Sequence, residues 1–109
     1  KAEVAARQSK LNDAVTQLDQ VLTKTNDVFG VNANLPGYSG TMTQEAVLQE
    51  IYRNRCIELF MSGMKLEDSR RFGRPGPTDA NPERNRNFYP YPNVERDNNP
   101  DNTPMDPPV

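Results

Sequence analysis

The chain has 109 residues and a formal net charge of −2, with its basic side chains scattered along it. This balance argues against nucleic acid and against an anionic membrane surface as the partner. Hydrophobic residues make up only 34 % of the chain, below the ~45–50 % usual for soluble domains, so we expect a small core that needs contacts with more protein. The chain starts at Lys1 and shows no signal peptide, so we expect it to be part of a longer protein.

Residues 2–29 predict one long amphipathic helix. Its apolar side chains follow a spacing of three and four residues. They are Val4, Leu11, Val15, Leu18 and Leu22. Packing within a globular protein is favoured over a coiled-coil seam, because a seam would place Gln8 and Thr25 in core positions.

A loop with Pro36, Gly37 and Gly40 follows over residues 30–41. A second helix is expected to begin at a capping box of Thr41 with Gln44, or at Thr43, and to run to about residue 62. A shorter helix over residues 65–72 should end at Gly73. Two helices joined by about a dozen residues suggest an antiparallel hairpin. The sequence therefore predicts a mainly α fold, with residues 1–74 as a helical hairpin portion.

Two charges interrupt the apolar side of the second helix. Arg55 lies near the middle of that side and Glu58 at its edge, among Val47, Ile51 and Tyr52. A charge on a buried face is costly unless it is paired and hydrogen-bonded. The charged residues just downstream are the candidate partners. These are Glu67, Asp68, Arg70 and Arg71.

Residues 75–109 form a different kind of segment. Nine of the ten prolines and seven asparagines fall in it, so neither a helix nor a central strand is expected there. The aromatic rings of Phe88, Tyr89 and Tyr91 should pin an ordered, extended strap over residues 87–99 onto a surface. We therefore expect an irregular C-terminal segment rich in proline and asparagine after residue 74.

The residues give no support to an enzyme. Histidine is absent and Cys56 is the single cysteine, so a nucleophile would have no histidine base and a zinc site would lack ligands. Cys56 is expected to be a small buried hydrophobe. Asp97, Asn99 and Asp101 alternate like a calcium loop, but the required glycine and bidentate glutamate are missing. No catalytic residue, metal site or cofactor is predicted.

The aromatic residues raise the possibility of sugar binding. Flat rings stack on sugar faces, while amide and guanidinium groups bond to hydroxyls. Tyr38, or Tyr89 and Tyr91 beside Arg86 and Asn87, could supply both. For Tyr89 and Tyr91 we favour the alternative, that the rings simply hold the strap in place. Tyr38, Arg86 and Asn87 are therefore the weak ligand-binding candidates.

Several blocks of the sequence resemble the C-terminal signature of the SusD/RagB family in order and spacing. The blocks are Glu45-Ala46-Val47-Leu48, Arg55-Cys56-Ile57-Glu58-Leu59, Gly63, Asp68-Ser69-Arg70-Arg71-Phe72-Gly73, Phe88-Tyr89-Pro90-Tyr91-Pro92, Glu95 and Asn99-Pro100. The resemblance covers about residues 41–100. Three departures are Ser62, where the family has glutamate, Lys65, where it has arginine, and Ser69, where it usually has leucine.

The resemblance implies an outer-membrane, surface-exposed lipoprotein of Bacteroidetes with tetratricopeptide-like helix pairs. Such proteins are not enzymes; they bind oligosaccharides or other nutrients and sit over a TonB-dependent transporter. The lipid anchor would lie outside this chain. The resemblance also implies that a structural ion-pair network holds the charges of the second and third helices. Its members would be Arg55, Glu58, Asp68, Arg70 and Arg71.

A stand-alone helical adaptor is the alternative function. It would bind a partner protein through the face that contains Arg55.

Overall fold

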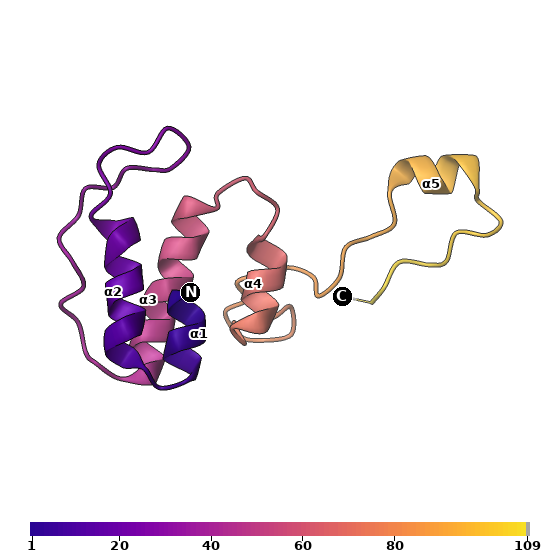
Figure 1. The fold of residues 1–109 in the computed structure, drawn as a ribbon. Helices are drawn as coiled ribbons and strands as arrows, with labels where there is room; N and C mark the ends of the chain where they lie inside the picture. Colours follow the sequence, from indigo (N-terminus) through magenta and orange to yellow (C-terminus); the bar gives the residue numbers. More distant parts are fainter. Residues whose placement is uncertain (109) are drawn as a thin grey trace. The chain divides into compact units, whose positions relative to one another are not determined.

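A computed structural model describes residues 1–108, which fold into helices and loops without a strand (Figure 1). The helices are α1 (Ala2–Arg7), α2 (Leu11–Leu22), α3 (Gln44–Glu58), α4 (Lys65–Arg71) and α5 (Asn93–Asn98). The predicted mainly α fold is confirmed. Val109, at the end of the predicted C-terminal segment, lies outside the described residues. The chain divides into an N-terminal unit, Lys1–Gly63, and a C-terminal unit, Met64–Val109.

The prediction of one helix over residues 2–29 is wrong, because the chain turns between α1 and α2. Ser9 adopts a left-handed backbone with φ of 61°. Its N–H donates to Ala6 O at 3.0 Å, and the N–H of Lys10 donates to Ala5 O at 2.9 Å. This pair of bonds is a Schellman motif, which satisfies the last carbonyl groups of α1. The residue in this left-handed position of the motif is usually glycine. Because serine stands there instead, the sequence gave no sign that the helix breaks.

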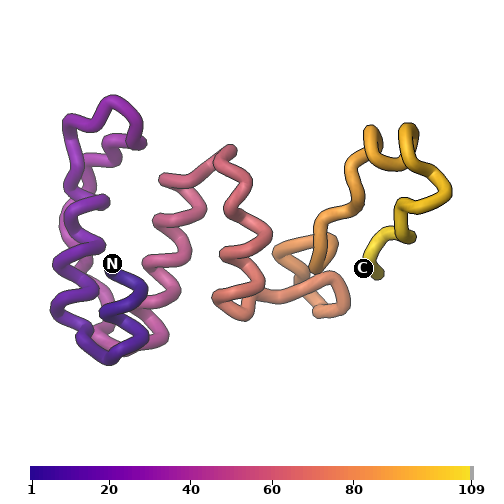
Figure 2. The backbone as a smooth tube through the Cα atoms, turned by 45° about the vertical axis from the view of Figure 1, so that its right-hand side comes forward, coloured from indigo at the N-terminus to yellow at the C-terminus, as the bar shows by residue number. Residues whose placement is uncertain are grey.

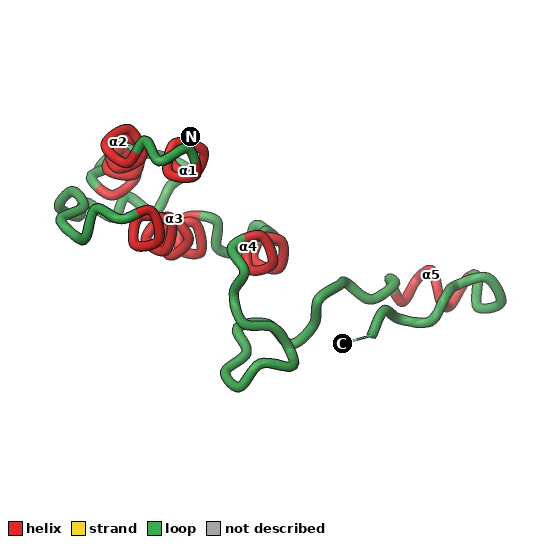
Figure 3. The backbone as a smooth tube through the Cα atoms, turned by 90° about the horizontal axis from the view of Figure 1, so that it is seen from below, coloured by secondary structure: helices red, strands yellow, loops and turns green. Residues whose placement is uncertain are grey.

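The core of the N-terminal unit lies where α1, α2 and α3 meet, and Figure 3 views these three helices nearly end-on as a triangle. The buried side chains are Ala6 from α1, Ala14, Leu18 and Leu22 from α2, and Val47, Ile51 and Tyr52 from α3. The α2 members recur every four residues and therefore share one face of the helix. This core is small, as the low hydrophobic content predicted.

The predicted antiparallel hairpin is also wrong, because α2 and α3 run in the same direction. The connection between them returns along α2, where the N–H of Tyr38 donates to Asp19 Oδ1 at 2.7 Å. At the start of α3, Gln44 Nε2 donates to Ala6 O at 2.9 Å. Beyond the end of α2, the N–H of Val31 donates to Glu58 Oε2 at 3.3 Å. Figure 2 follows this return path. Helix α1 runs antiparallel to both α2 and α3, which it contacts.

The start of α3 is fixed by Thr43, the second of the two predicted caps. Its hydroxyl accepts from the N–H of Ala46 at 3.3 Å, as an N-cap residue does. The capping box of Thr41 with Gln44 is not formed, since Thr43 takes the N-cap position. Gln44 Nε2 instead donates to the last carbonyls of α1. The helix ends at Glu58, short of the predicted residue 62. Gly63 follows with φ of 80°.

The C-terminal unit begins with α4, whose predicted end is confirmed. Gly73 has φ of 63°, and Arg74 N–H donates to Ser69 O at 2.9 Å, a second Schellman motif. The expectation that no helix forms after residue 75, and that residues 87–99 are extended throughout, is wrong. Pro92 caps the short helix α5. Proline is tolerated there because the first residues of a helix need no amide partner within it.

Candidate functional site

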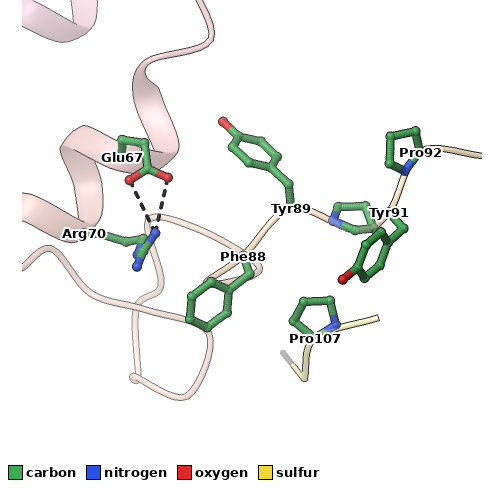
Figure 4. A pocket seen from close by; sticks show the side chains of 8 residues that line it. Glu67, Arg70, Phe88, Tyr89, Tyr91, Pro92 and Pro107 are labelled. Atoms are coloured by element: carbon green, nitrogen blue, oxygen red, sulfur yellow. Dashed lines mark hydrogen bonds and ion pairs between the residues drawn. The ribbon is translucent and has the colours of Figure 1, made fainter. Parts of the chain in front are cut away.

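The C-terminal unit contains an open pocket of about 360 Å³. Glu67 and Arg70 of α4 form one side of it. The aromatic segment, defined as Phe88-Tyr89-Pro90-Tyr91-Pro92, and Pro107 form the rest (Figure 4). The volume is at the lower end of the ~300–1,000 Å³ usual for small-molecule sites. We therefore take this pocket as the candidate functional site.

An ion pair on α4 supplies the polar side of the pocket. Arg70 Nη1 donates to both carboxylate oxygens of Glu67, at 3.2 and 3.3 Å. The two residues are three apart and so share one face of the helix. The guanidinium carbon of Arg70 also lies 4.8 Å from the centroid of the Phe88 ring, a cation–π contact. These contacts on two sides fix the orientation of the guanidinium group.

The two tyrosines of the pocket are held by the prolines that follow them. A residue before proline is restricted to extended backbone, because the proline ring would clash with it in a helix. The backbones of both Tyr89 and Tyr91 are therefore restricted to extended conformations. Tyr89 is 57 % exposed and Tyr91 is 38 % exposed. Figure 4 shows Tyr91 on the same side of the segment as Phe88 and Pro107, and Tyr89 on the side of Glu67.

Arg84 fastens the aromatic segment to α4. Its Nη1 donates to Ser69 Oγ at 3.1 Å and to the carbonyl oxygen of Arg74. Its Nε donates to Asn87 Oδ1 at 3.0 Å. A side chain at Gly76 would approach Arg84 Nη2 to 2.9 Å, so glycine leaves the space that the guanidinium needs. Sequence reasoning missed Arg84, since it stands in an aperiodic polar stretch where nothing distinguishes it from Arg86.

Asp106 bonds to the aromatic segment next to the pocket. Its Oδ1 accepts a hydrogen bond from the N–H of Tyr91 at 3.1 Å. The same oxygen forms an ion pair with Arg96 of α5. The hydrogen bond from Arg96, and then the one from the Tyr91 amide, lower the pKa of the Asp106 carboxyl from its ordinary value of 3.8. Asp106 thereby brings Pro107 beside the aromatic segment.

The three predicted ligand candidates do not line this pocket. Tyr38 lies in the N-terminal unit, where its hydroxyl donates to Thr41 O at 2.9 Å and its ring fills the space beside Gly40. Asn87 precedes the aromatic segment and holds Arg84. Arg86 is exposed. The structure thus gives Tyr38 and Asn87 roles in holding loops.

The residues of the predicted ion-pair network make separate contacts within each unit. In α4, Arg71 Nη2 lies 2.7 Å from Oδ1 of the buried Asp68, while Arg70 pairs with Glu67. In the N-terminal unit, Glu58 accepts the N–H of Val31, and Arg55 is half-buried. The network that joins all five residues stays a prediction.

The described part of the chain contains neither a metal-ligand cluster nor a membrane-spanning helix. No group of three or more acidic, cysteine or histidine side chains lies close enough there to hold a metal ion. None of the helices formed by residues 1–108 has the length and apolar character needed to cross a bilayer. Cys56 is half-buried in α3, less completely than expected.

Comparisons with known proteins return no match: no family model, no curated protein and no solved structure matches the chain. The pocket offers flat apolar rings beside a carboxylate and a guanidinium group. Such an arrangement suits a small ligand with one apolar face and several hydrogen-bonding groups.

Proposed function

We propose that the chain is the C-terminal part of a SusD/RagB-like surface lipoprotein that binds a nutrient glycan for uptake through a TonB-dependent transporter. The observation that carries this proposal is the order and spacing of the residue blocks that resemble the family. The blocks with Arg55 and with Asp68 coincide with α3 and α4, and the Tyr-Pro block lines the pocket.

The proposal includes tetratricopeptide-like helix pairs for the fold and a structural role for the ion-pair network. The antiparallel contact between α1 and α2 is what such a pair would contain. The burial of Asp68, which pairs with Arg71 within α4, suits an internal ion pair rather than a ligand contact. An enzymatic activity is not part of the proposal.

Surface location and partnership are tested on the gene product that carries this sequence, tagged and expressed in its native cells. We expect it in the outer-membrane fraction, degraded by proteinase K added to intact cells, and co-purified with a TonB-dependent transporter identified by mass spectrometry. A periplasmic protein exposed only after lysis is the control. Recovery from the cytosol without a transporter would contradict the proposal.

Exposed apolar side chains favour the helical adaptor as the second candidate function. Val28 and Phe29, after α2, and Phe60 and Met61, after α3, are all strongly exposed. The bond from Val31 to Glu58 ties these two segments together. Exposed apolar patches often mark protein–protein contacts. Under this candidate the gene product would co-purify with one protein that is not a transporter, and Phe29→Asp would abolish the association.

A further inference from the structure

We infer that the pocket of the C-terminal unit binds a neutral saccharide, with a sugar ring against Tyr91 and its hydroxyls on the Glu67–Arg70 pair. This inference rests on the proposed function, because it names the ligand site of a glycan-binding protein. Each residue of the site is nevertheless assigned from the chemistry of its own side chain.

The polar side of the pocket is suited to hydroxyl groups. In the part of the chain that the structure describes, the Arg70 side chain donates hydrogen bonds through Nη1 only, so its Nε and Nη2 can donate to a ligand. Each oxygen of Glu67 accepts one bond from Arg70, and a carboxylate has about four acceptor positions. Adjacent hydroxyls of a sugar both accept and donate, and can bond the two groups together.

The charge of the pair favours a neutral ligand. A carboxylate and a guanidinium in direct contact, at 3.2 Å, sum to no net charge. An anionic ligand drawn to Arg70 would meet the repulsion of Glu67, and a cationic ligand drawn to Glu67 would meet that of Arg70. Polyhydroxyl compounds avoid both costs, which separates them from phosphorylated and carboxylated ligands.

The apolar side of the pocket provides flat surfaces for a sugar face. The C–H groups on one face of a pyranose are weakly positive and pack against the negative face of an aromatic ring. Tyr91 is partly exposed, and Pro107 also lines the pocket. Because Pro92 restricts the backbone of Tyr91 and Asp106 bonds its amide, little freedom is lost when a ligand binds.

An extended proline-rich peptide is the competing ligand, since such peptides also bind grooves lined by aromatic rings. The saccharide is favoured because the Glu67–Arg70 pair offers both donors and acceptors beside the rings. A proline-rich peptide has carbonyl acceptors but few donors with which to use Glu67.

Isothermal titration of the full chain against a panel of ligands tests the inference. The panel contains neutral hexasaccharides (maltohexaose, cellohexaose, xylohexaose and mannohexaose), hexagalacturonate as an acidic saccharide, and a decaproline peptide. We expect at least one neutral saccharide to bind. Tyr91→Ala and Glu67→Gln should each weaken that binding at least about tenfold, a change of about 1.4 kcal/mol. Phe29→Ala, which removes a ring that is 97 % exposed in the N-terminal unit, is the matched control and should bind as the unmodified chain does.

Each other outcome overturns the inference in a distinguishable way. Saccharide binding that both pocket variants retain would leave the proposed function standing and place the site elsewhere. Binding of hexagalacturonate in preference to every neutral sugar would contradict the charge argument. Decaproline binding lost in Tyr91→Ala would identify a peptide groove. Failure to bind any saccharide would count against both the inference and the proposed glycan function. Unchanged far-UV circular dichroism shows that each variant is folded.

Discussion

Arg84 gives the sharpest prediction about how the pocket is held together. Its guanidinium joins Ser69 on α4, the Arg74 carbonyl and Asn87 beside the aromatic segment. Arg84→Met keeps an unbranched apolar stem and removes all three bonds. The aromatic segment should then detach from α4 more often, while the N-terminal unit is unaffected.

The size of the effect follows from these bonds. A hydrogen bond with one charged partner contributes about 1.5–3 kcal/mol, and an acceptor left buried without a partner adds a cost. Ser69 is fully buried, so its hydroxyl would lose its bond without gaining one from water. Because Arg84 itself is only half-buried, we take about 2 kcal/mol as the loss in the free energy of local opening. The open population should rise about thirtyfold.

Chymotrypsin measures this opening at one bond. The enzyme cleaves after aromatic residues but not before proline, so Phe88–Tyr89 is its only cleavable aromatic bond within the aromatic segment. When opening and closing are fast relative to cleavage, the rate follows the open population. The rate of cleavage after Phe88, followed by mass spectrometry, should therefore increase about thirtyfold in Arg84→Met.

Arg86→Met is the matched control, since Arg86 is exposed two residues away and the substitution introduces the same side chain. It should be cleaved after Phe88 at the rate of the unmodified chain. If Arg84→Met were cleaved no faster than Arg86→Met, Arg84 would not hold the segment and the pocket geometry would be wrong.

Three further predictions concern the two units. Ile51→Ala, in the core, should lower the free energy of unfolding in urea by about 2–5 kcal/mol, whereas Ile57→Ala, at a position 47 % exposed, should lower it by less than about 1 kcal/mol; equal losses would contradict the core assignment. Gly73→Ala should lower the free energy of unfolding by about 1–2 kcal/mol, because the φ of Gly73 is positive and alanine disfavours that backbone conformation. A Cβ at this position would contact no other atom, so no new packing offsets the loss. A variant with a higher melting temperature would contradict the left-handed turn. Contact with Arg96 lowers the pKa of Asp106 in the folded chain below its ordinary value of 3.8. The stabilisation from this contact should therefore be complete above pH 3.8 and lost as the pH falls through the pKa of the folded state. A ¹³C titration midpoint of the Asp106 carboxyl at or above 3.8 would contradict the contact.

The helices were partly predictable because their signals are local. Gly73 marked the end of α4, and the apolar spacing of Leu18 and Leu22 marked the buried face of α2. The break at Ser9 was not predictable from that spacing, because the left-handed turn is formed by a residue other than glycine. Helix boundaries of this kind depend on backbone hydrogen bonds that apolar periodicity does not report.

Local sequence patterns could predict neither the direction of α3 nor the pocket. The length of the connection allowed an antiparallel hairpin, but contacts such as Tyr38 with Asp19 and Val31 with Glu58 return the chain along α2. The pocket depends on Arg84, which bonds to residues ten and fifteen positions away. The aromatic rings and the charges of Glu67 and Arg70 carried signals in the sequence, but nothing there showed that they share one pocket.

Tyrosine ring-proton NMR tests the central claim most directly. The chain has four tyrosines, two in the pocket and two, Tyr38 and Tyr52, in the N-terminal unit. When the neutral hexasaccharide that binds is titrated into the full chain, the ring protons of Tyr91 and Tyr89 should shift progressively while those of Tyr38 and Tyr52 stay in place. Shifts at Tyr38 alone, or at no tyrosine, would contradict the account.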